Sequence, residues 1–169
     1  MNILILNASP RKNGNVETVL RNELGKYKND KIIWEDVSKL NFDFCKGCMI
    51  CRSKENCILP QDDAHRIAME IKECDLLFVG TPVYWGNMNG KLKSLFDRLV
   101  GVMMAESKLG IPIPLHKGKK AVIVTSCTTP FPFNYLCGQS TGAVHAVKEI
   151  LKSSGFKIIR KINVSGTKK

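Results

Sequence analysis

Short apolar runs separated by stretches with helical spacing are the feature that most limits how this chain can fold. Five such runs occur, at residues 3–6, 32–34, 76–79, 121–124 and 156–164. Most are continuous rather than alternating in hydrophobicity, which is typical of strands covered on both faces. The runs therefore predict a parallel sheet buried in the middle of the protein.

Between the runs, apolar residues recur every three or four positions in segments 16–24, 64–71, 92–99 and 144–151, which predicts amphipathic helices. Asp62 and Asp63 stand where the second helix should begin and suit its cap and dipole. Gly155 follows the fourth helix as a stop signal. Alternating strands and helices predict one α/β domain over residues 1–169, a three-layer sandwich with strand order 2-1-3-4-5.

Two departures from a regular pattern are expected. The sequence stops soon after the fifth run, so we expect the last helix of such folds to be absent. Part of one sheet face would then need another cover, such as a partner subunit. The stretch 101–118 is long for a connection, and we expect it to form a lid or an interface arm.

Composition excludes several classes of protein. A hydrophobic share of 44% and a charged share of 24% are ordinary for a globular chain and unlike a disordered or fibrous one. Without a membrane-length apolar run or a signal peptide, we expect a cytoplasmic protein that does not contact membranes. The net charge of +11 favours anionic ligands. The lysines are dispersed, so a solvated basic surface is expected rather than a nucleic-acid-binding face.

The loop after the first strand has the composition of a phosphate site. Residues 7–15 read Asn-Ala-Ser-Pro-Arg-Lys-Asn-Gly-Asn and run directly into a helix. A hydroxyl, backbone amides, two cations and a helix N-terminus are brought together there. The loop lacks the Walker lysine spacing and the G-x-G-x-x-G pattern, so it predicts neither an NTPase nor a classical dinucleotide site. An ordinary capped turn is the alternative interpretation.

The loop after the third strand could bind a flat ring. Within residues 80–90, Pro82 stiffens the backbone, and Tyr84 and Trp85 offer planar faces beside exposed amides. Taken alone, two aromatic residues in a loop more often serve packing. Ligands of such sheets bind at the carboxyl ends of the strands, however, and this loop is expected to lie opposite the phosphate loop.

Together with segment 90–98, these loops resemble the NADPH-dependent FMN reductase branch of the flavodoxin-like superfamily, over nearly the whole chain. The resemblance implies a flavodoxin-like fold, bound FMN, and a homodimer or homotetramer with the flavin near the subunit interface. The FMN phosphate would lie on Ser9, Arg11, Asn13, Gly14 and Asn15. The isoalloxazine would lie against Pro82, Val83, Tyr84, Trp85 and Gly86. The loop after the fourth strand lacks the glycines of many relatives, and its candidate ring contacts are Ser126 and Thr128.

Four cysteines within thirteen residues form a second candidate site: Cys45, Cys48, Cys51 and Cys57. Their spacing, C-x2-C-x2-C-x5-C, resembles the compact motif of the iron–sulfur flavoproteins of the same superfamily. Three thiolates at two-residue gaps can wrap a [4Fe–4S] cluster, with a fourth ligand arriving from downstream. Redox-active or free thiols and a zinc site are the other interpretations. Because the segment follows a strand end, we expect it to lie near the flavin.

The sequence thus predicts an FMN-dependent oxidoreductase. Hydride would pass from NADH or NADPH to the flavin, and electrons would then pass to a second small molecule. Hydride transfer needs no acid or base, so no catalytic side chain is predicted. One alternative is an iron–sulfur flavoprotein carrier that takes electrons from ferredoxin through a four-cysteine cluster. A remote one is a cysteine-bound zinc module that binds nucleic acid.

Overall fold

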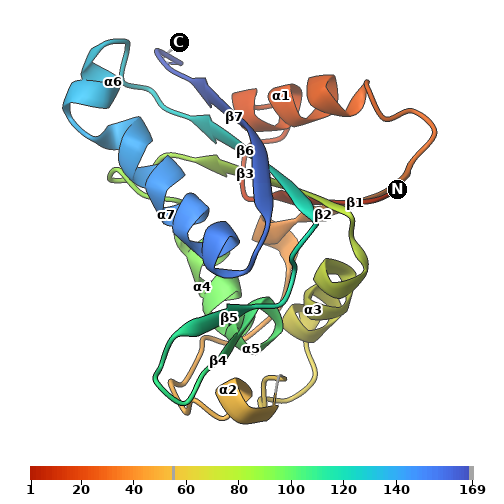
Figure 1. Ribbon diagram of the computed structural model, residues 1–169. Coiled ribbons are helices and arrows are strands. Elements are labelled where there is room, and N and C mark those ends of the chain that lie inside the picture. Colours follow the sequence, from red (N-terminus) through yellow and green to blue (C-terminus); the bar gives the residue numbers. More distant parts are fainter. Residues whose placement is uncertain (55, 168–169) are drawn as a thin grey trace.

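The computed structural model describes residues 1–54 and 56–167, which form a three-layer α/β sandwich (Figure 1). Its parallel sheet consists of β1 (Asn2–Asn7), β2 (Lys31–Asp36), β3 (Leu76–Pro82), β6 (Lys120–Ser126) and β7 (Lys157–Val164). The spatial order is β2-β1-β3-β6-β7. When the two short strands outside this sheet are left out, the order is the predicted 2-1-3-4-5.

Helices cover both faces of the sheet. One face carries α1 (Asn15–Leu24), and the other carries α3 (Asp63–Glu73), α4 (Gly90–Arg98) and α7 (Gln139–Ser153). The first three begin and end within two residues of their predicted bounds. By contrast, α7 begins five residues before the predicted start at 144, because its first turn is polar and small and carries no apolar periodicity.

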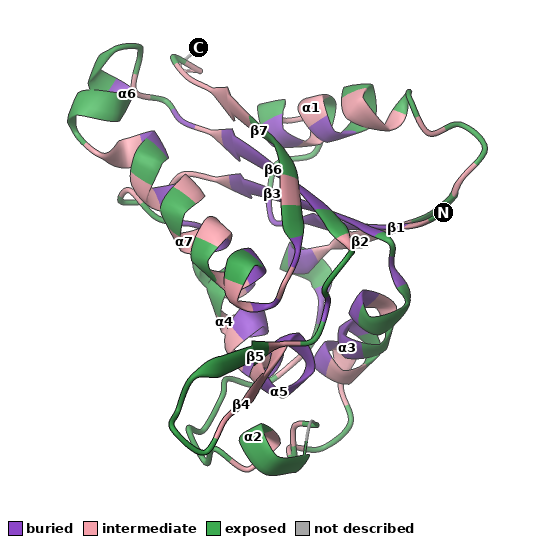
Figure 2. Cartoon of the chain, viewed as in Figure 1, coloured by how far each residue is buried: buried purple, intermediate pink, exposed green. Residues whose placement is uncertain are grey.

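The continuous apolar runs are explained by two hydrophobic clusters, one on each side of the sheet. On the α1 face, Val16 and Leu20 pack against Phe78 and the residues beside it. On the opposite face, Leu92 and Val147 belong to a larger cluster that joins α3, α4 and α7 to the sheet. Since successive strand residues point to opposite faces, both sets of side chains are buried. Figure 2 shows this burial along the central strands.

The predicted helix signals are confirmed at both positions. Asp62 is the N-cap of α3 and accepts a hydrogen bond from Ala64 N at 3.0 Å, within a capping box completed by His65. Gly155 follows the C-cap of α7 with a φ of +92°, a conformation that glycine adopts without strain.

The stretch 101–118 is more regular than a loop. After the short helix α5 (Val100–Met103), strands β4 (Met104–Glu106) and β5 (Pro112–Pro114) pair as an antiparallel hairpin. The hairpin lies beside α2 (Cys51–Lys54), to which it is tied by an ion pair of 2.7 Å between Arg52 and Glu106. Its role as a lid or interface arm stays a prediction.

The remaining described elements are short. The turn η1 (Val37–Lys39) follows β2, and α6 (Phe133–Leu136) precedes α7. Residues 165–167, after β7, belong to no helix or strand. Over the described chain, none of the helices combines the length and the apolar character needed to cross a bilayer.

Candidate functional site

The two predicted ligand loops leave neighbouring strands at the carboxyl edge of the sheet. In the pairing of β1 with β3, Asn7 lies opposite Gly80, and just beyond it Ala8 N donates to Gly80 O at 2.8 Å. From this point the chain after β1 continues into α1 on one face, and the chain after β3 continues into α4 on the other. Such a divergence is the switch point at which open α/β sheets bind ligands.

The phosphate loop is preformed around Ser9. This residue is only 8% exposed, its amide donates to Asn7 Oδ1 at 3.1 Å, and its Oγ accepts from Arg11 N at 3.3 Å. At the start of α1, Gly14 is extended, and no described side chain caps the first turn. The amides of that turn, beginning at Asn15, therefore suit an anion.

Glu17, in the first turn of α1, supports this loop and was missed by the sequence reasoning. Its carboxylate accepts from Asn13 N at 2.9 Å and so fixes the left-handed turn at Asn13, which has a φ of +54°. A hydrogen bond from Arg21, with that of Asn13, lowers the pKa of Glu17 below its usual range. An acidic residue in the first turn of a predicted helix is a recognisable sequence signal, so Glu17 could have been found.

The loop after β3 presents Trp85 at the tip of a tight turn. Tyr84 and Asn87 exchange two backbone hydrogen bonds of 2.9 Å, and the two residues between them have positive φ, +52° for Trp85 and +72° for Gly86. This is the geometry of a type I′ turn. A bulky residue at positive φ is strained by about 1–3 kcal/mol, and such strain clusters at ligand sites. The Trp85 side chain is 100% exposed and free to contact a ligand.

Two polar residues that the sequence reasoning missed close the base of this loop. Thr81 Oγ1 accepts from Asn89 N at 2.9 Å, and Asn89 Oδ1 in turn caps α4 through Lys91 N at 2.9 Å. An asparagine directly before a helical apolar pattern is a recognisable cap signal, so Asn89 could have been found. Thr81 could not, because its partner lies eight residues away.

The predicted contact loop after β6 is joined by a backbone hydrogen bond to the loop after β3. Val83 N donates to Ser126 O at 2.8 Å, which joins the end of β3 to the end of β6. Ser126 is half-buried, whereas Thr128 is exposed. The structure therefore brings the three predicted loops together at adjacent strand ends, and their contacts with FMN stay predictions.

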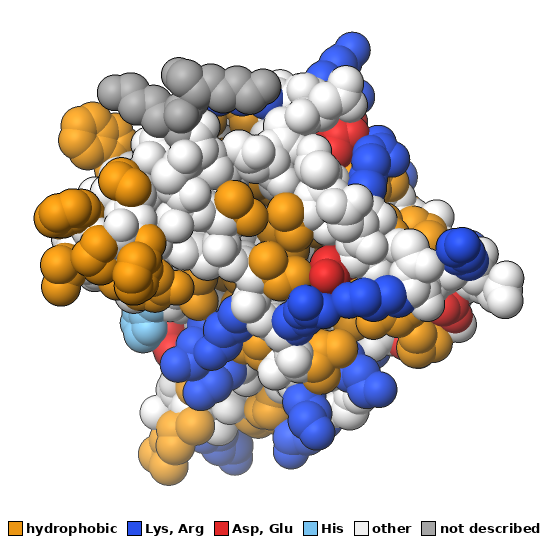
Figure 3. All heavy atoms as spheres, turned by 90° about the horizontal axis from the view of Figure 1, so that it is seen from above, with side chains coloured by type: hydrophobic (Ala, Val, Ile, Leu, Met, Phe, Trp, Pro, Cys, Tyr) orange, Lys and Arg blue, Asp and Glu red, His pale blue; other side chains and the backbone are white. Residues whose placement is uncertain are grey.

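An apolar patch borders the β3 loop. Gly86 lies beside the junction of α6 and α7, at Gly138 and Gln139. The α6 segment exposes several large hydrophobic side chains, namely Phe131, Phe133, Tyr135 and Leu136. On the face seen in Figure 3, hydrophobic side chains gather at one side. Exposed groups of this kind are typical of binding surfaces.

The cysteine segment lies away from the ligand loops, contrary to the expectation from sequence. The chain between β2 and this segment runs along α4 from its start to its end. Lys91 Nζ, near the start of α4, donates to Ser38 O at 2.9 Å, and Arg98, at its end, donates to Asp43 O at 2.7 Å. The nine residues of α4 span about 14 Å. Figure 1 accordingly shows α2 at the opposite end of the molecule from the β3 loop.

The four thiols are not assembled into a metal centre. Cys45 and Cys48 are exposed, Cys51 begins α2, and Cys57 is half-buried. Burial raises the pKa of the Cys51 thiol above its usual value. In the described part of the chain, no three Cys, His, Asp or Glu side chains are close enough to hold a metal ion. The donor set is chemically suited to a cluster or zinc, but its arrangement in this structure does not fit either.

Arg98 fastens this segment to the core, an interaction that the sequence reasoning missed. Its buried guanidinium donates to Cys57 Sγ at 3.2 Å and to both oxygens of Asp62, at 2.7 and 3.1 Å. Burial raises the pKa of Asp62, but the hydrogen bonds from the Arg98 guanidinium outweigh it and hold the pKa below its usual value. His65 also donates from Nε2 to Cys57 O at 3.0 Å. Arg98 therefore holds both ends of the cysteine segment.

The sheet order and the joined strand-end loops define a flavodoxin-like α/β protein. Residues 1–130 match the NADPH-dependent FMN reductase family, and the chain belongs to that family of FMN-dependent oxidoreductases. This confirms the resemblance stated from the sequence motifs.

Curated relatives are iron–sulfur flavoproteins by name. One from Methanocaldococcus jannaschii is 32% identical over 100 residues, which cover 58% of this chain and 51% of the relative. One from Clostridioides difficile is 34% identical over 149 residues, 82% of this chain and 65% of the relative. The chain thus spans about half to two thirds of the length of these relatives.

Solved structures share the fold at low sequence identity. The FMN-dependent NADH-azoreductase from Bacillus anthracis, solved in complex with FMN, superposes with a TM-score of 0.77 at 16% identity. The match covers 99% of this chain and 88% of that one. At this identity the similarity concerns the fold alone.

Proposed function

We propose that this protein is an FMN-dependent NAD(P)H oxidoreductase. The observation that carries the proposal is the joining of three strand-end loops at the β1/β3 switch point, with an uncapped helix start on one side and Trp85 on the other. The residues fit FMN, which has an anion at one end and a flat ring at the other. When bound, FMN would accept hydride from a reduced nicotinamide and pass electrons to a second acceptor.

The chain would bind the two ends of the cofactor by different means. Ser9, Arg11 and the amides around Asn15 would hold the phosphate, because hydroxyl, cation and helix N-terminus all favour an anion. The rigid turn at Trp85 would offer an aromatic face to the ring. Backbone amides near the ring would stabilise negative charge on the reduced flavin, so no side-chain acid or base is required.

The same proposal includes small-molecule substrates and a homo-oligomer. The site is open on the side of Trp85, where a nicotinamide donor and a second acceptor could approach in turn. The apolar patch at Phe131 and Leu136 would be covered by a second subunit in a homodimer or homotetramer. Light scattering of the purified protein tests this part, and a monomer at all concentrations would contradict it.

Titration with FMN tests the central claim. We expect saturable quenching of FMN fluorescence, and markedly weaker quenching of riboflavin, which lacks the phosphate. With FMN bound, NADH or NADPH should be oxidised in the presence of a quinone or azo dye, as followed by nicotinamide absorbance. Absence of saturable FMN binding would refute the function. FMN binding without nicotinamide oxidation would show that the protein is a flavoprotein but not an NAD(P)H oxidoreductase.

The iron–sulfur flavoprotein is a second candidate, favoured by the names of the relatives and by four thiols on one segment. In the described residues no three donor side chains are close enough to hold a metal ion, which speaks against a preassembled centre. Anaerobic purification followed by iron and sulfide assay separates the candidates. Four irons for each chain, and reduction by ferredoxin, would favour the carrier. Iron-free yellow protein would favour the reductase.

A further inference from the structure

β7 is an edge strand with one free side. It pairs with β6, and the described sheet order places no strand beyond it. With eight residues it is the longest strand of the sheet. The free edge of such a strand carries backbone N–H and C=O groups that can pair with another chain.

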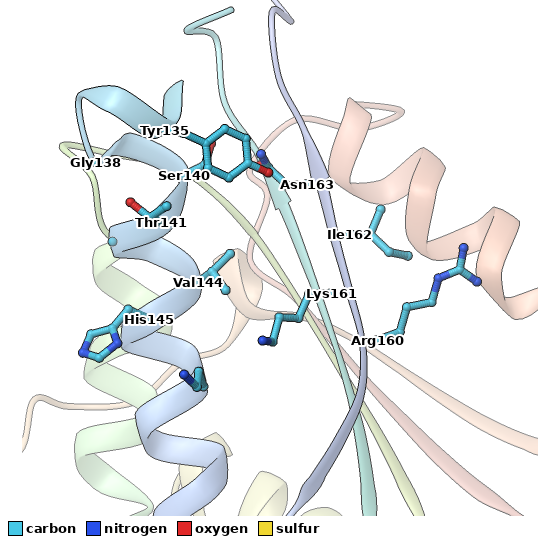
Figure 4. Close-up of a pocket in the computed structure, with 12 residues that line it drawn as sticks. Tyr135, Gly138, Ser140, Thr141, Val144, His145, Arg160, Lys161, Ile162 and Asn163 are labelled. Carbon is cyan, nitrogen blue, oxygen red and sulfur yellow. The ribbon is translucent and has the colours of Figure 1, made fainter. Parts of the chain in front are cut away.

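A groove of about 1000 Å³ follows this free edge (Figure 4). Four consecutive residues of β7, at 160–163, line one wall. Consecutive strand residues point to opposite faces, so the groove follows the edge of the strand rather than one face of the sheet. The outer flank of α7 provides the other wall through Thr141, Val144, His145 and Lys148. The groove therefore lies where a sixth strand would lie.

The lining of the groove is basic. Lys161 points from β7 toward α7, and Lys148 lines the groove from α7 itself. Arg160 points to the other face of β7, where it forms an ion pair of 3.0 Å with Glu23 of α1. Among the described residues that line the groove, none is acidic. An occupant with negative charge is therefore favoured.

The same charges disfavour a second copy of this strand. Antiparallel pairing of two β7 strands centred on Arg160 or on Lys161 would set that cation opposite its own copy, because directly opposed side chains lie on the same face. Like charges directly opposite each other destabilise a strand pair. A partner of opposite charge removes this repulsion.

We propose that the β7 edge docks an extended acidic segment of another protein, which adds to the sheet as a sixth strand. Residues facing α7 would be Asp or Glu and would lie near Lys148 and Lys161. Residues facing the other way would be apolar and would lie near Ile162. Backbone hydrogen bonds would supply affinity, and the alternating side chains would supply specificity. The proposal is independent of flavin binding.

A fluorescein-labelled peptide of alternating glutamate and valine, as long as β7, serves as the probe. We expect saturable fluorescence anisotropy with the whole protein. Replacing the central valine by proline should weaken binding at least about tenfold, because proline cannot donate a ladder hydrogen bond. The double substitution Lys148→Glu and Lys161→Glu should weaken it similarly. The matched pair Lys28→Glu and Lys108→Glu, remote from the groove, should change it less than about threefold.

Amide hydrogen exchange locates the peptide. We expect it to slow exchange in β7 and to leave β2, the opposite edge of the sheet, unchanged. Equal binding of the proline peptide would show charge attraction without strand addition. Equal binding by the Lys148/Lys161 variant would show that these lysines do not attract the peptide. Either result would overturn the proposal. Protection of β7 that rises with protein concentration alone would assign the edge to a second copy. Absence of saturation at about 1 mM peptide would also overturn it.

Discussion

Gly142, in the first turn of α7, lies so close to Gly86 of the β3 loop that a Cβ on Gly142 would overlap the carbonyl oxygen of Gly86. Gly86 is the second central residue of the turn that presents Trp85. The backbone at the start of α7 therefore packs directly against the turn of the candidate ring site, although more than fifty residues separate the two glycines in sequence.

The substitution Gly142→Ala should displace this turn. The added methyl group meets backbone rather than a flexible side chain, so the β3 loop must shift. We expect FMN affinity, measured by fluorescence quenching, to fall about tenfold or more. Gly90→Ala is the matched control, because a Cβ there meets nothing within 4 Å. Equal losses of FMN affinity in both variants would show that the contact between Gly142 and Gly86 does not support the ring site.

Ser9→Ala should weaken FMN selectively. The variant removes the hydroxyl that accepts from Arg11 N and would contact the phosphate. Loss of a hydrogen bond to a charged group corresponds to about 1.5–3 kcal/mol, or roughly 10- to 100-fold in Kd. Riboflavin binding should stay unchanged, since it has no phosphate. Ser94→Ala, whose hydroxyl bonds within α4, is the control and should affect neither ligand.

Trp85→Gly should change stability and FMN affinity in opposite directions. Glycine relieves the positive φ of +52°, which should raise the free energy of unfolding by about 1 kcal/mol in urea titrations. Loss of the aromatic face should weaken FMN binding. Met49→Gly, at a φ of +59° in the cysteine segment, should relieve similar strain without weakening FMN. If Trp85→Gly leaves FMN affinity intact, Trp85 is not a ring contact.

Arg98→Met should destabilise the protein severely. It leaves the Asp62 carboxylate without its buried guanidinium partner and frees Cys57 and Asp43. Breaking such a pair from one side costs about 3–5 kcal/mol. The exposed pair of Lys93 and Asp97 on the same helix offers the control, and Lys93→Met should cost less than about 1 kcal/mol. Similar unfolding midpoints for the two variants would contradict this prediction.

His116 should make stability depend on pH. Its ring is buried, donates from Nε2 to Val102 O at 2.9 Å and packs on Phe156. Burial, together with Lys119, lowers the pKa of His116 below 6.5. Below about pH 6.5 the unfolded chain binds a proton that the folded chain resists, so stability is complete above that pH and falls below it.

Urea unfolding between about pH 7.5 and pH 5 measures this effect. His116→Gln keeps a donor but cannot titrate, so its stability should fall less with decreasing pH. His145→Gln, at an exposed position on α7, should follow the wild-type profile. A wild-type profile for His116→Gln would show that other groups cause the pH dependence.

Much of this molecule could be predicted because the relevant signals are local. The apolar runs predicted the five strands of the sheet, and Asp62 and Gly155 predicted where two helices begin and end. The loops that follow β1 and β3 could be assigned to one edge, since parallel strands end on the same side of a sheet. Residues 1–130 then matched the family that those loops suggested.

The sequence alone therefore determined the sheet, its order and the three loops of the candidate site, since these follow from short-range periodicity and strand direction. Only the tertiary structure decided that Arg98 binds Cys57, that Gly142 backs Gly86, and that the cysteine segment lies away from the ring site. Each of these depends on packing between residues far apart in the chain. No local pattern encodes such a contact, because its free energy arises only when the two surfaces meet.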